Sequence, residues 1–295
     1  MKAIDSFSAA IAKDPNFAAA YVARATAYGL AGFLSIPQRE SVPKVKADVE
    51  RALALNDTIG QAHAIRALFV YFLYQWDWPA AEREFQVALK LSPDDSNIHF
   101  YYGYCLSALG RFDDSLREKL RARELDPQNP IWVGQTGDTF FNARKYDQAL
   151  QYYQQQMAMA PDFSWGHWAR GWTLLKLRGD RAAFVRDEEK AVAMADTLTN
   201  QSALAYAYTL AGRSDEARRI LRQKFEEASK RQYVDPGYFA LTYFALGDKD
   251  RAFELLDQAY QDRSALMVLL NLPYNDPMRS DPRYTALVKK VGLPP

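Results

Sequence analysis

The sequence predicts an all-helical solenoid built from repeated pairs of helices. Prolines recur at a fixed interval of 34 residues, at Pro93, Pro127 and Pro161. Glycines recur at the same interval, at Gly103, Gly137 and Gly171. Between these positions most residues change, but apolar residues return three and four positions apart, as on one face of a helix. A fixed period of this length is typical of repeat proteins, whose units stack on one another.

Each unit is expected to contain two amphipathic helices. In the third unit, the first helix is marked by Phe100, Tyr101, Tyr104, Leu106 and Leu109, and the second by Leu116, Leu120 and Leu125. Asp113 is expected to cap the second helix and Pro127 to end it. The recurring glycine falls inside a helix, where it costs roughly 1 kcal/mol relative to alanine. We therefore expect the partner helix to approach closely there, a contact that Ala205 and Ala240 also permit.

This pattern resembles the tetratricopeptide repeat, whose 34-residue unit reads W-x2-L-G-x2-Y…A-x3-F-x2-A…P. The second unit supplies Ala81, Phe85, Ala88 and Pro93, and the fourth supplies Gly137, Phe140, Ala149, Tyr153 and Pro161. The chain departs from the pattern at Phe69, where glycine is expected, and at Lys119 and Asp187, which occupy an aromatic position. The resemblance implies a right-handed α-solenoid of about seven helix-turn-helix repeats and a C-terminal capping helix.

The repeat phase sets the expected boundaries along the chain. The seven repeats are expected at 17–57, 58–95, 96–129, 130–163, 164–197, 198–234 and 235–264. Residues 33–43, "FLSIPQRESVP", are extra in the first repeat and are expected to form a loop. Residues 1–16 match the second helix of a truncated repeat, which suggests a fragment of a longer protein or a covered end; a short natural cap is the alternative. Residues 265–295 are expected to form the C-terminal cap.

The end of the chain adds a narrower resemblance. "ALGDKDRAFELLDQAYQDRS", followed by "DPMRSDPRYTALVKKVGL", resembles the C-terminal repeat region of large bacterial signalling proteins. In that group the repeats follow a winged-helix DNA-binding domain, a serine/threonine kinase domain or a nucleotide cyclase domain. The resemblance implies a sensor or interaction region whose output domain would lie upstream. It carries over no residue of such an output domain.

Composition excludes several classes of function. The chain of 295 residues carries 37 basic and 36 acidic residues, so its balanced charge does not indicate nucleic-acid binding. Cys105 is the only cysteine, which rules out an internal disulfide and argues against a cysteine-based zinc site. The sequence has no apolar run of about 18 residues, so membrane insertion is not expected. We expect a cytoplasmic location, with an extracytoplasmic one as the alternative if a membrane span lies upstream.

Catalytic chemistry finds no support in the sequence. His99 and His167 lie 68 residues apart, twice the repeat length, which indicates one structural position in two repeats. The patterns of zinc proteases, serine hydrolases and phosphate-binding loops do not occur. We therefore expect no enzyme activity, no catalytic residue, no metal site and no cofactor.

The expected binding site is the concave groove that the first helices of tetratricopeptide arrays form. By resemblance, the groove is lined by Arg66, Tyr74, Phe100, Tyr104, Asp138, Phe141, Asn142, Trp165, Trp168, Trp172, Lys176 and Tyr206. The three tryptophans share one helix face, and aromatic anchors on a concave surface suit a peptide or small ligand. The alternative is that these rings fill the inner wall. Because Tyr104, Asp138 and Trp172 replace the asparagines of chaperone-binding relatives, a clamp for a C-terminal carboxylate is not expected.

The predicted function is therefore non-catalytic binding of a protein or peptide. Two alternatives belong to another class: a free-standing adaptor, and a scaffold that self-assembles through apolar surface of residues 3–13 at its open N-terminal end.

Overall fold

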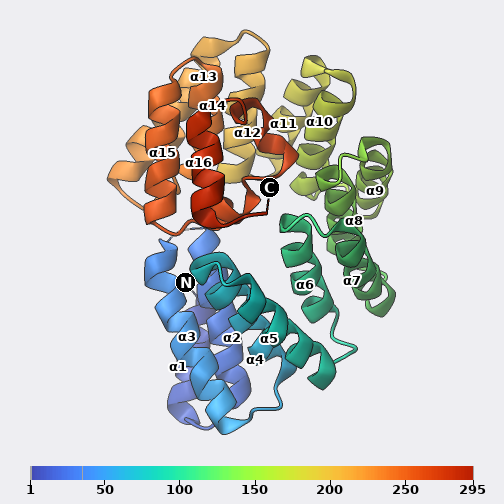
Figure 1. The fold of residues 1–295 in the computed structure, drawn as a ribbon, viewed down its shortest axis with the longest axis vertical. Coiled ribbons are helices and arrows are strands. Elements are labelled where there is room, and N and C mark those ends of the chain that lie inside the picture. The colour runs from blue at the N-terminus through green and yellow to red at the C-terminus, as the bar shows by residue number, and fades with distance from the viewer. Residues whose placement is uncertain (1, 35, 295) are drawn as a thin grey trace.

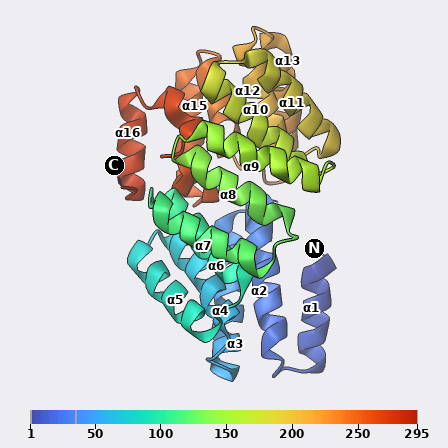
Figure 2. The ribbon, with the colours of Figure 1, turned by 90° about the vertical axis from the view of Figure 1, so that its right-hand side faces the viewer.

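The computed structural model describes residues 2–34 and 36–294, and Figure 1 shows paired helices stacked into a right-handed α-solenoid. Helix α1 (Lys2–Lys13) stands alone at the N-terminal end, against α2 (Figure 2). The first pairs are α2 (Ala18–Leu34) with α3 (Gln38–Leu55), α4 (Gly60–Ile65) and its continuation η1 (Arg66–Gln75) with α5 (Trp78–Leu91), and α6 (Ser96–Ala108) with α7 (Phe112–Leu125).

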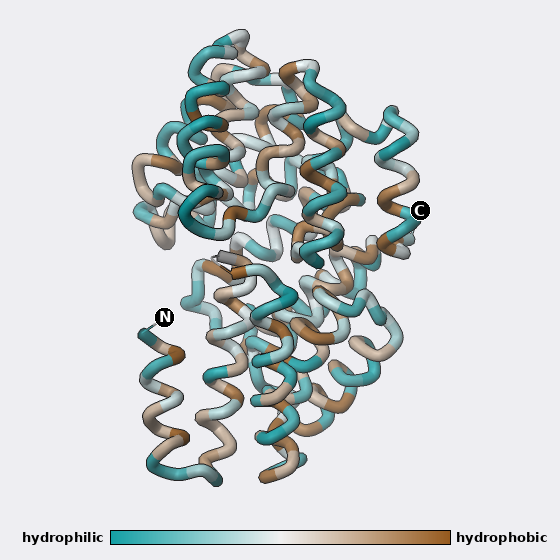
Figure 3. Tube along the Cα trace, turned by 90° about the vertical axis from the view of Figure 1, so that its left-hand side faces the viewer, coloured by the Kyte–Doolittle hydropathy of each residue, from teal (hydrophilic) through white to brown (hydrophobic). Residues whose placement is uncertain are grey.

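The later pairs are α8 (Pro130–Asn142) with α9 (Tyr146–Met159), α10 (Ser164–Arg178) with α11 (Arg181–Met194), α12 (Leu198–Leu210) with α13 (Ser214–Ile220), and α14 (Gly237–Ala245) with α15 (Lys249–Gln261). Helix α13 continues into η2 (Leu221–Glu227) and η3 (Ala228–Lys230). The chain ends with η4 (Ala265–Leu269), η5 (Pro273–Met278) and α16 (Pro282–Val291). Polar and apolar segments alternate along the helices (Figure 3), as amphipathic packing requires.

The recurring glycines lie where the two helices of a repeat touch. A β-carbon on Gly103 would lie 2.8 Å from Lys119 Cγ, and one on Gly137 would lie 2.9 Å from Tyr153 Cε1. At Gly171 it would lie 3.0 Å from Glu188 Oε1. The expected close approach is confirmed, because these distances are shorter than ordinary van der Waals contact.

The turn between the helices of the third repeat differs from the expectation. Gly110, at φ +76°, ends the first helix, and Arg111 already accepts the first hydrogen bond of α7 through its carbonyl. Arg111 is therefore the N-cap residue, and the prediction for Asp113 was wrong. Asp113 lies in the first turn instead, where the positive end of the helix dipole stabilises its carboxylate.

The extra residues of the first repeat do not form the expected loop over 33–43. Helix α2 continues to Leu34 and α3 already begins at Gln38, so most of the insertion extends the two helices. Val42 and Val45 are buried in the N-terminal core, and their burial stabilises the early start of α3. Pro43 lies inside this helix and removes one backbone donor without ending it.

The two ends of the solenoid meet, as Figure 1 shows for α3 and α15. Arg39 of α3 forms an ion pair with Asp262, which follows α15. Trp76, after η1, packs against Tyr260 with 5.1 Å between ring centroids. Trp78 Nε1 donates a hydrogen bond to the carbonyl oxygen of Gly292, 3.1 Å away. These contacts close the array on itself.

The C-terminal segment, residues 264–281, lies on the concave side of the middle repeats. The ring of Tyr274 packs against Phe141 of α8 at 4.7 Å between centroids, and against Trp168 and Trp172 of α10 at 5.3 and 5.1 Å. From the expected cap, η4 and α16 pack on the outermost second helix, α15. The chain therefore fills part of its own groove.

Asp276 anchors this segment electrostatically. Its two carboxylate oxygens accept hydrogen bonds of 2.7 Å from the guanidinium of Arg144, while Lys176 and Arg279 donate at 3.2 and 2.9 Å. Burial alone would raise the pKa of Asp276, but these three cationic partners outweigh it and hold the pKa at about 2.

The glycine contact can be tested at Gly137. We expect Gly137→Ala to lower the thermal midpoint, because overpacking costs about 1–3 kcal/mol, which exceeds the roughly 1 kcal/mol that alanine gains in helix propensity. The control is Ala205→Gly at the same repeat position, where loss of a fully buried methyl group should also destabilise. A higher midpoint for Gly137→Ala would contradict the close approach.

The Asp276 cluster predicts a specific pH dependence. Because its pKa is depressed, the carboxylate stabilises the fold above the unfolded value of about 3.9, and this contribution is lost as pH falls towards 2. We expect Asp276→Asn to lower the thermal midpoint at pH 7, and the gap from wild type to narrow between pH 4 and pH 2. The control is Asp257→Asn, which removes an exposed carboxylate 3.9 Å from Lys290. A gap that stays constant down to pH 2 would exclude this role.

Candidate functional site

The inner surface of the middle repeats brings together most of the expected groove residues. Five of them, Tyr104, Asp138, Asn142, Trp165 and Trp168, line one cavity beneath the C-terminal segment. Phe141 and Trp172 contact Tyr274, and Tyr206 stacks on Trp172 with 5.3 Å between centroids. Lys176 reaches Asp276. These residues therefore surround the C-terminal segment, with Tyr206 one ring further out.

Three expected groove residues lie elsewhere. Arg66 binds Glu84 of α5 in its own repeat, with guanidinium-to-carboxylate distances of 2.8 Å. Tyr74 packs against the N-terminal hydrophobic core. The ring of Phe100 packs at a tilt against Trp132 of the next repeat, with 4.7 Å between centroids. Tyr74 lies eight residues into η1, a wider π-helix, which shifts its side chain away from the phase of an α-helix.

The aromatic cluster is covered by the chain itself. Trp168 and Trp172 are only 8% and 4% exposed, because the C-terminal segment lies over them. A peptide cannot reach these two rings in this conformation. The alternative interpretation of the tryptophans, that they fill the inner wall, therefore describes their packing better than an open groove does.

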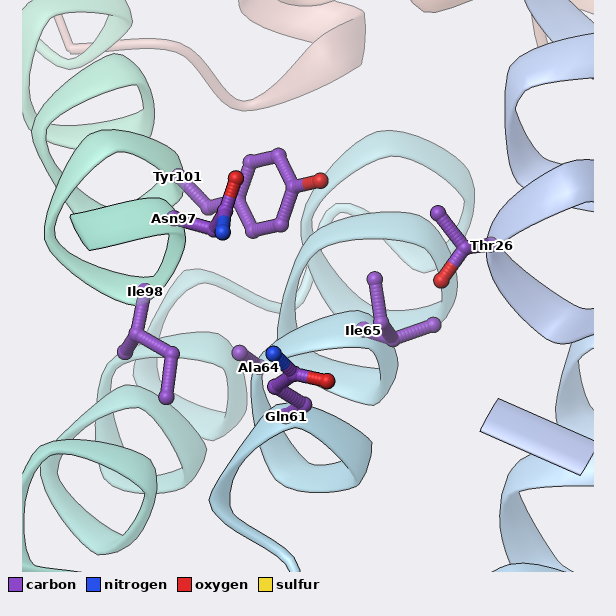
Figure 4. Close-up of a pocket in the computed structure, with 7 residues that line it drawn as sticks. All are labelled: Thr26, Gln61, Ala64, Ile65, Asn97, Ile98 and Tyr101. Atoms are coloured by element: carbon purple, nitrogen blue, oxygen red, sulfur yellow. The ribbon is translucent and has the colours of Figure 1, made fainter. Parts of the chain in front are cut away.

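An open pocket remains on the inner surface of the N-terminal repeats (Figure 4). It has a volume of about 190 Å³ and lies between three successive first helices. Its lining consists of Thr26 from α2, Gln61, Ala64 and Ile65 from α4, and Asn97, Ile98 and Tyr101 from α6. The amides of Gln61 and Asn97 are exposed, while Ala64, Ile65 and Ile98 are buried beneath them.

Sequence reasoning missed this pocket. Gln61 and Asn97 occupy equivalent places at the starts of two first helices, but they lie 36 residues apart instead of 34. The two additional residues interrupt the repeat phase in the second unit. The pocket could have been predicted from the amide side chain that occurs at the start of both helices.

The histidines occupy one structural position, as expected from their spacing. His99 Nδ1 lies 2.7 Å from Glu118 of the partner helix, and His167 Nδ1 lies 3.3 Å from Asp187. His63 has the same kind of contact, with Glu84 at 2.8 Å. Burial alone would lower the pKa of His99, but hydrogen bonds to Glu118 and to the Pro93 carbonyl outweigh it and raise the pKa. Each imidazole thus joins the two helices of its repeat.

The described residues contain neither a metal-binding cluster nor a membrane-spanning helix. Among residues 2–34 and 36–294, no group of three or more histidine, cysteine or acidic side chains has the geometry to hold a metal ion. No helix in the described part of the chain combines the length and apolar character needed to cross a membrane. The thiol of Cys105 is buried, which raises its pKa well above the usual range.

Comparisons with known proteins agree with this architecture. Residues 66–130 match the family model of the tetratricopeptide repeat. Hsp70-Hsp90 organizing protein 3 of Arabidopsis thaliana is 25% identical over 118 residues, which are 40% of this chain and 21% of that protein. Hsp70-Hsp90 organizing protein 1 of Glycine max is 26% identical over 88 residues, 30% of this chain and 15% of that protein. The chain thus spans about a fifth or less of these relatives.

Solved structures match over nearly the whole chain. Yeast Tom70 is 18% identical with a TM-score of 0.59, over 99% of this chain and 61% of that chain. A chain of the APC/C hetero-tetramer Cut9-Hcn1 is 13% identical with a TM-score of 0.64, over 98% of this chain and 52% of that chain. Likeness at such low identity establishes the fold. The chain therefore folds as a solenoid of tetratricopeptide repeats, with a sequence match to that repeat over residues 66–130.

Proposed function

We propose that this chain is a non-catalytic binding module that holds an extended segment of a partner protein in the open pocket of the N-terminal repeats. The observation that carries the proposal is the contrast along the inner surface. The pocket between α2, α4 and α6 is open, whereas the C-terminal segment covers the aromatic cluster of the middle repeats. A partner can therefore reach the concave surface at its N-terminal end without displacing any part of the chain.

The chemistry of the pocket suits a peptide backbone. A primary amide both donates and accepts hydrogen bonds, which are the two requirements of a peptide group. Gln61 and Asn97 approach the pocket from neighbouring helices (Figure 4), and Tyr101 adds an aromatic ring beside Asn97. Each amide already donates one N–H to Asp95, at 2.7 and 3.3 Å, so the second N–H and the amide oxygen are the groups that a peptide would use. Buried Ile65 and Ile98 supply an apolar floor. A volume of about 190 Å³ suits one or two side chains of an extended segment rather than a folded domain.

The wider context follows from the resemblance of residues 245–264 and 276–293 to bacterial signalling proteins. We place the chain as the interaction or sensor region of such a protein. The Arabidopsis and soybean relatives are named as organizers of Hsp70 and Hsp90, which agrees with a role in holding partner proteins. An enzyme activity has no supporting group of side chains in the sequence.

Self-assembly through α1 is the alternative. The apolar residues Ile4, Phe7 and Ile11 are half-buried, whereas exposed positions of α1 include the small side chains Ala3 and Ala9. Because the exposed apolar side chains of α1 are small, its outer face offers little apolar area to a second copy. Sedimentation velocity over a concentration series separates the two functions, because a monomer at every concentration excludes the scaffold.

The peptide proposal can be tested with peptides selected from a phage-displayed library against the purified full chain. We expect the double variant Gln61→Ala, Asn97→Ala to bind the selected peptides about tenfold more weakly, because each lost hydrogen bond is worth about 0.5–1.5 kcal/mol. The matched control is Gln154→Ala with Gln155→Ala on the exposed side of α9. Equal affinity for both double variants, or a failure to select any peptide, would overturn the proposal.

A further inference from the structure

A second site lies deeper in the molecule, in the cavity beneath the C-terminal segment. This cavity has a volume of about 110 Å³. Its walls come from the first helices α6, α8 and α10, from Lys119 of α7 and from the segment itself, through Leu269, Leu272 and Tyr274. A dry cavity of about 150 Å³ holds the six carbon atoms of benzene, so this smaller volume suits a ligand of roughly four or five non-hydrogen atoms, the size of glycine.

The cavity contains a buried acid and a buried base. Lys119 is 2% exposed and Asp138 is 8% exposed. Lys119 Nζ donates a hydrogen bond to the Gln135 carbonyl at 2.9 Å, while Asp138 Oδ1 accepts one from the Tyr153 hydroxyl at 2.7 Å. Each charge is thus held by its own partner, and both side chains line the same space.

The two buried groups attract each other electrostatically. Burial lowers the pKa of Lys119 to about 8 against the attraction of Asp138, and it raises the pKa of Asp138 to about 6 against the attraction of Lys119. Their mutual attraction therefore favours the ammonium and the carboxylate over the neutral forms. Buried charges of this kind are costly unless they are paired and hydrogen-bonded, and here each charge has the other across the cavity and one hydrogen-bond partner.

The walls also carry hydrogen-bonding atoms with no partner in the described structure. The indole Nε1 of Trp168 is a buried donor without an acceptor, and Asn142 Oδ1 is a buried acceptor without a donor. Asn142 is held in place because its Nδ2 donates to Ser107 Oγ at 3.0 Å. An unpaired buried polar atom costs about 1–3 kcal/mol, which a bound molecule would relieve.

We propose that this cavity binds a small zwitterion of the α-amino-acid class. Lys119 and the Trp168 indole supply donors for a carboxylate, and Asp138 and Asn142 Oδ1 supply acceptors for an ammonium group. A molecule with both charges satisfies all four groups without changing the net charge of the cavity. A simple anion would be repelled by the carboxylate of Asp138, and a simple cation would be repelled by the ammonium of Lys119.

A route to the cavity is visible in the structure. A neighbouring pocket of about 360 Å³ shares Ser107, Ala108, Asn142 and Leu272 with it. Exposed Gly110 and Arg279 line the outer part of this pocket. Because the C-terminal segment forms one wall, a bound amino acid would join this segment to the repeats. The site is independent of the proposed peptide pocket, which lies between other helices.

The test is to titrate the full chain with glycine, L-alanine and L-serine. Binding is measured by isothermal titration calorimetry and by tryptophan fluorescence. We expect at least one of them to bind with a Kd below 1 mM. Acetate and ethylamine, which carry one charge each, should bind at least tenfold more weakly. No response to any of the three amino acids up to 10 mM would overturn the proposal and leave the cavity to water.

Variants locate the binding. Lys119→Met and Asp138→Asn should each lower the affinity for the amino acid at least tenfold. Ala108→Val should lower it equally, because the larger side chain fills the cavity without removing a charge. The matched control is Trp132→Phe, because Trp132 is a buried tryptophan outside the cavity with an unpaired Nε1. Wild-type affinity in a folded Ala108→Val protein would exclude this site even if the charge variants failed to fold.

Discussion

The packing of Tyr274 against the tryptophans of α10 is the contact on which the arrangement of the inner surface depends. Trp168 and Trp172 present a large apolar area on a concave wall, and an area of this size must be covered by a partner or by the chain. Here the chain covers it: Tyr274 contacts both indoles, and Asp276 is held between Arg144 and Lys176. The aromatic contact supplies burial, and the ionic contacts fix the position of the segment.

This contact divides the concave surface into two regions of different chemistry. Under the segment, the remaining space is small and lined by Lys119 and Asp138, whose side chains are buried. Beyond the segment, between α2 and α6, the pocket is open and lined by neutral amides. Buried charges select small molecules that match them one by one, whereas exposed amides suit the repeating groups of a backbone. The proposed sites therefore follow from where the segment lies.

The sequence was sufficient for the periodic part of the structure. The recurring glycines predicted the close approach of paired helices, and the spacing of His99 and His167 predicted a structural position. Local departures were harder to predict. Residues 33–43 were expected to form a loop because they are extra to the repeat, but burial of Val42 and Val45 extends α3. The π-helical turns of η1 moved Tyr74 out of phase. The contact of Tyr274 with Trp172 joins residues about a hundred positions apart. Such a contact leaves no periodic or local trace.

Closure of the array changes how such a protein is expected to unfold. Open repeat arrays contact only their nearest neighbours, so their terminal repeats fray and stability propagates from unit to unit. In this chain Trp78 binds Gly292 across 214 residues, and Arg39 binds Asp262 across 223 residues. These bonds are long-range contacts, and the entropic cost of closing such long loops slows folding. In exchange, the first and last repeats share one cooperative transition, so neither of the two joined ends can open alone.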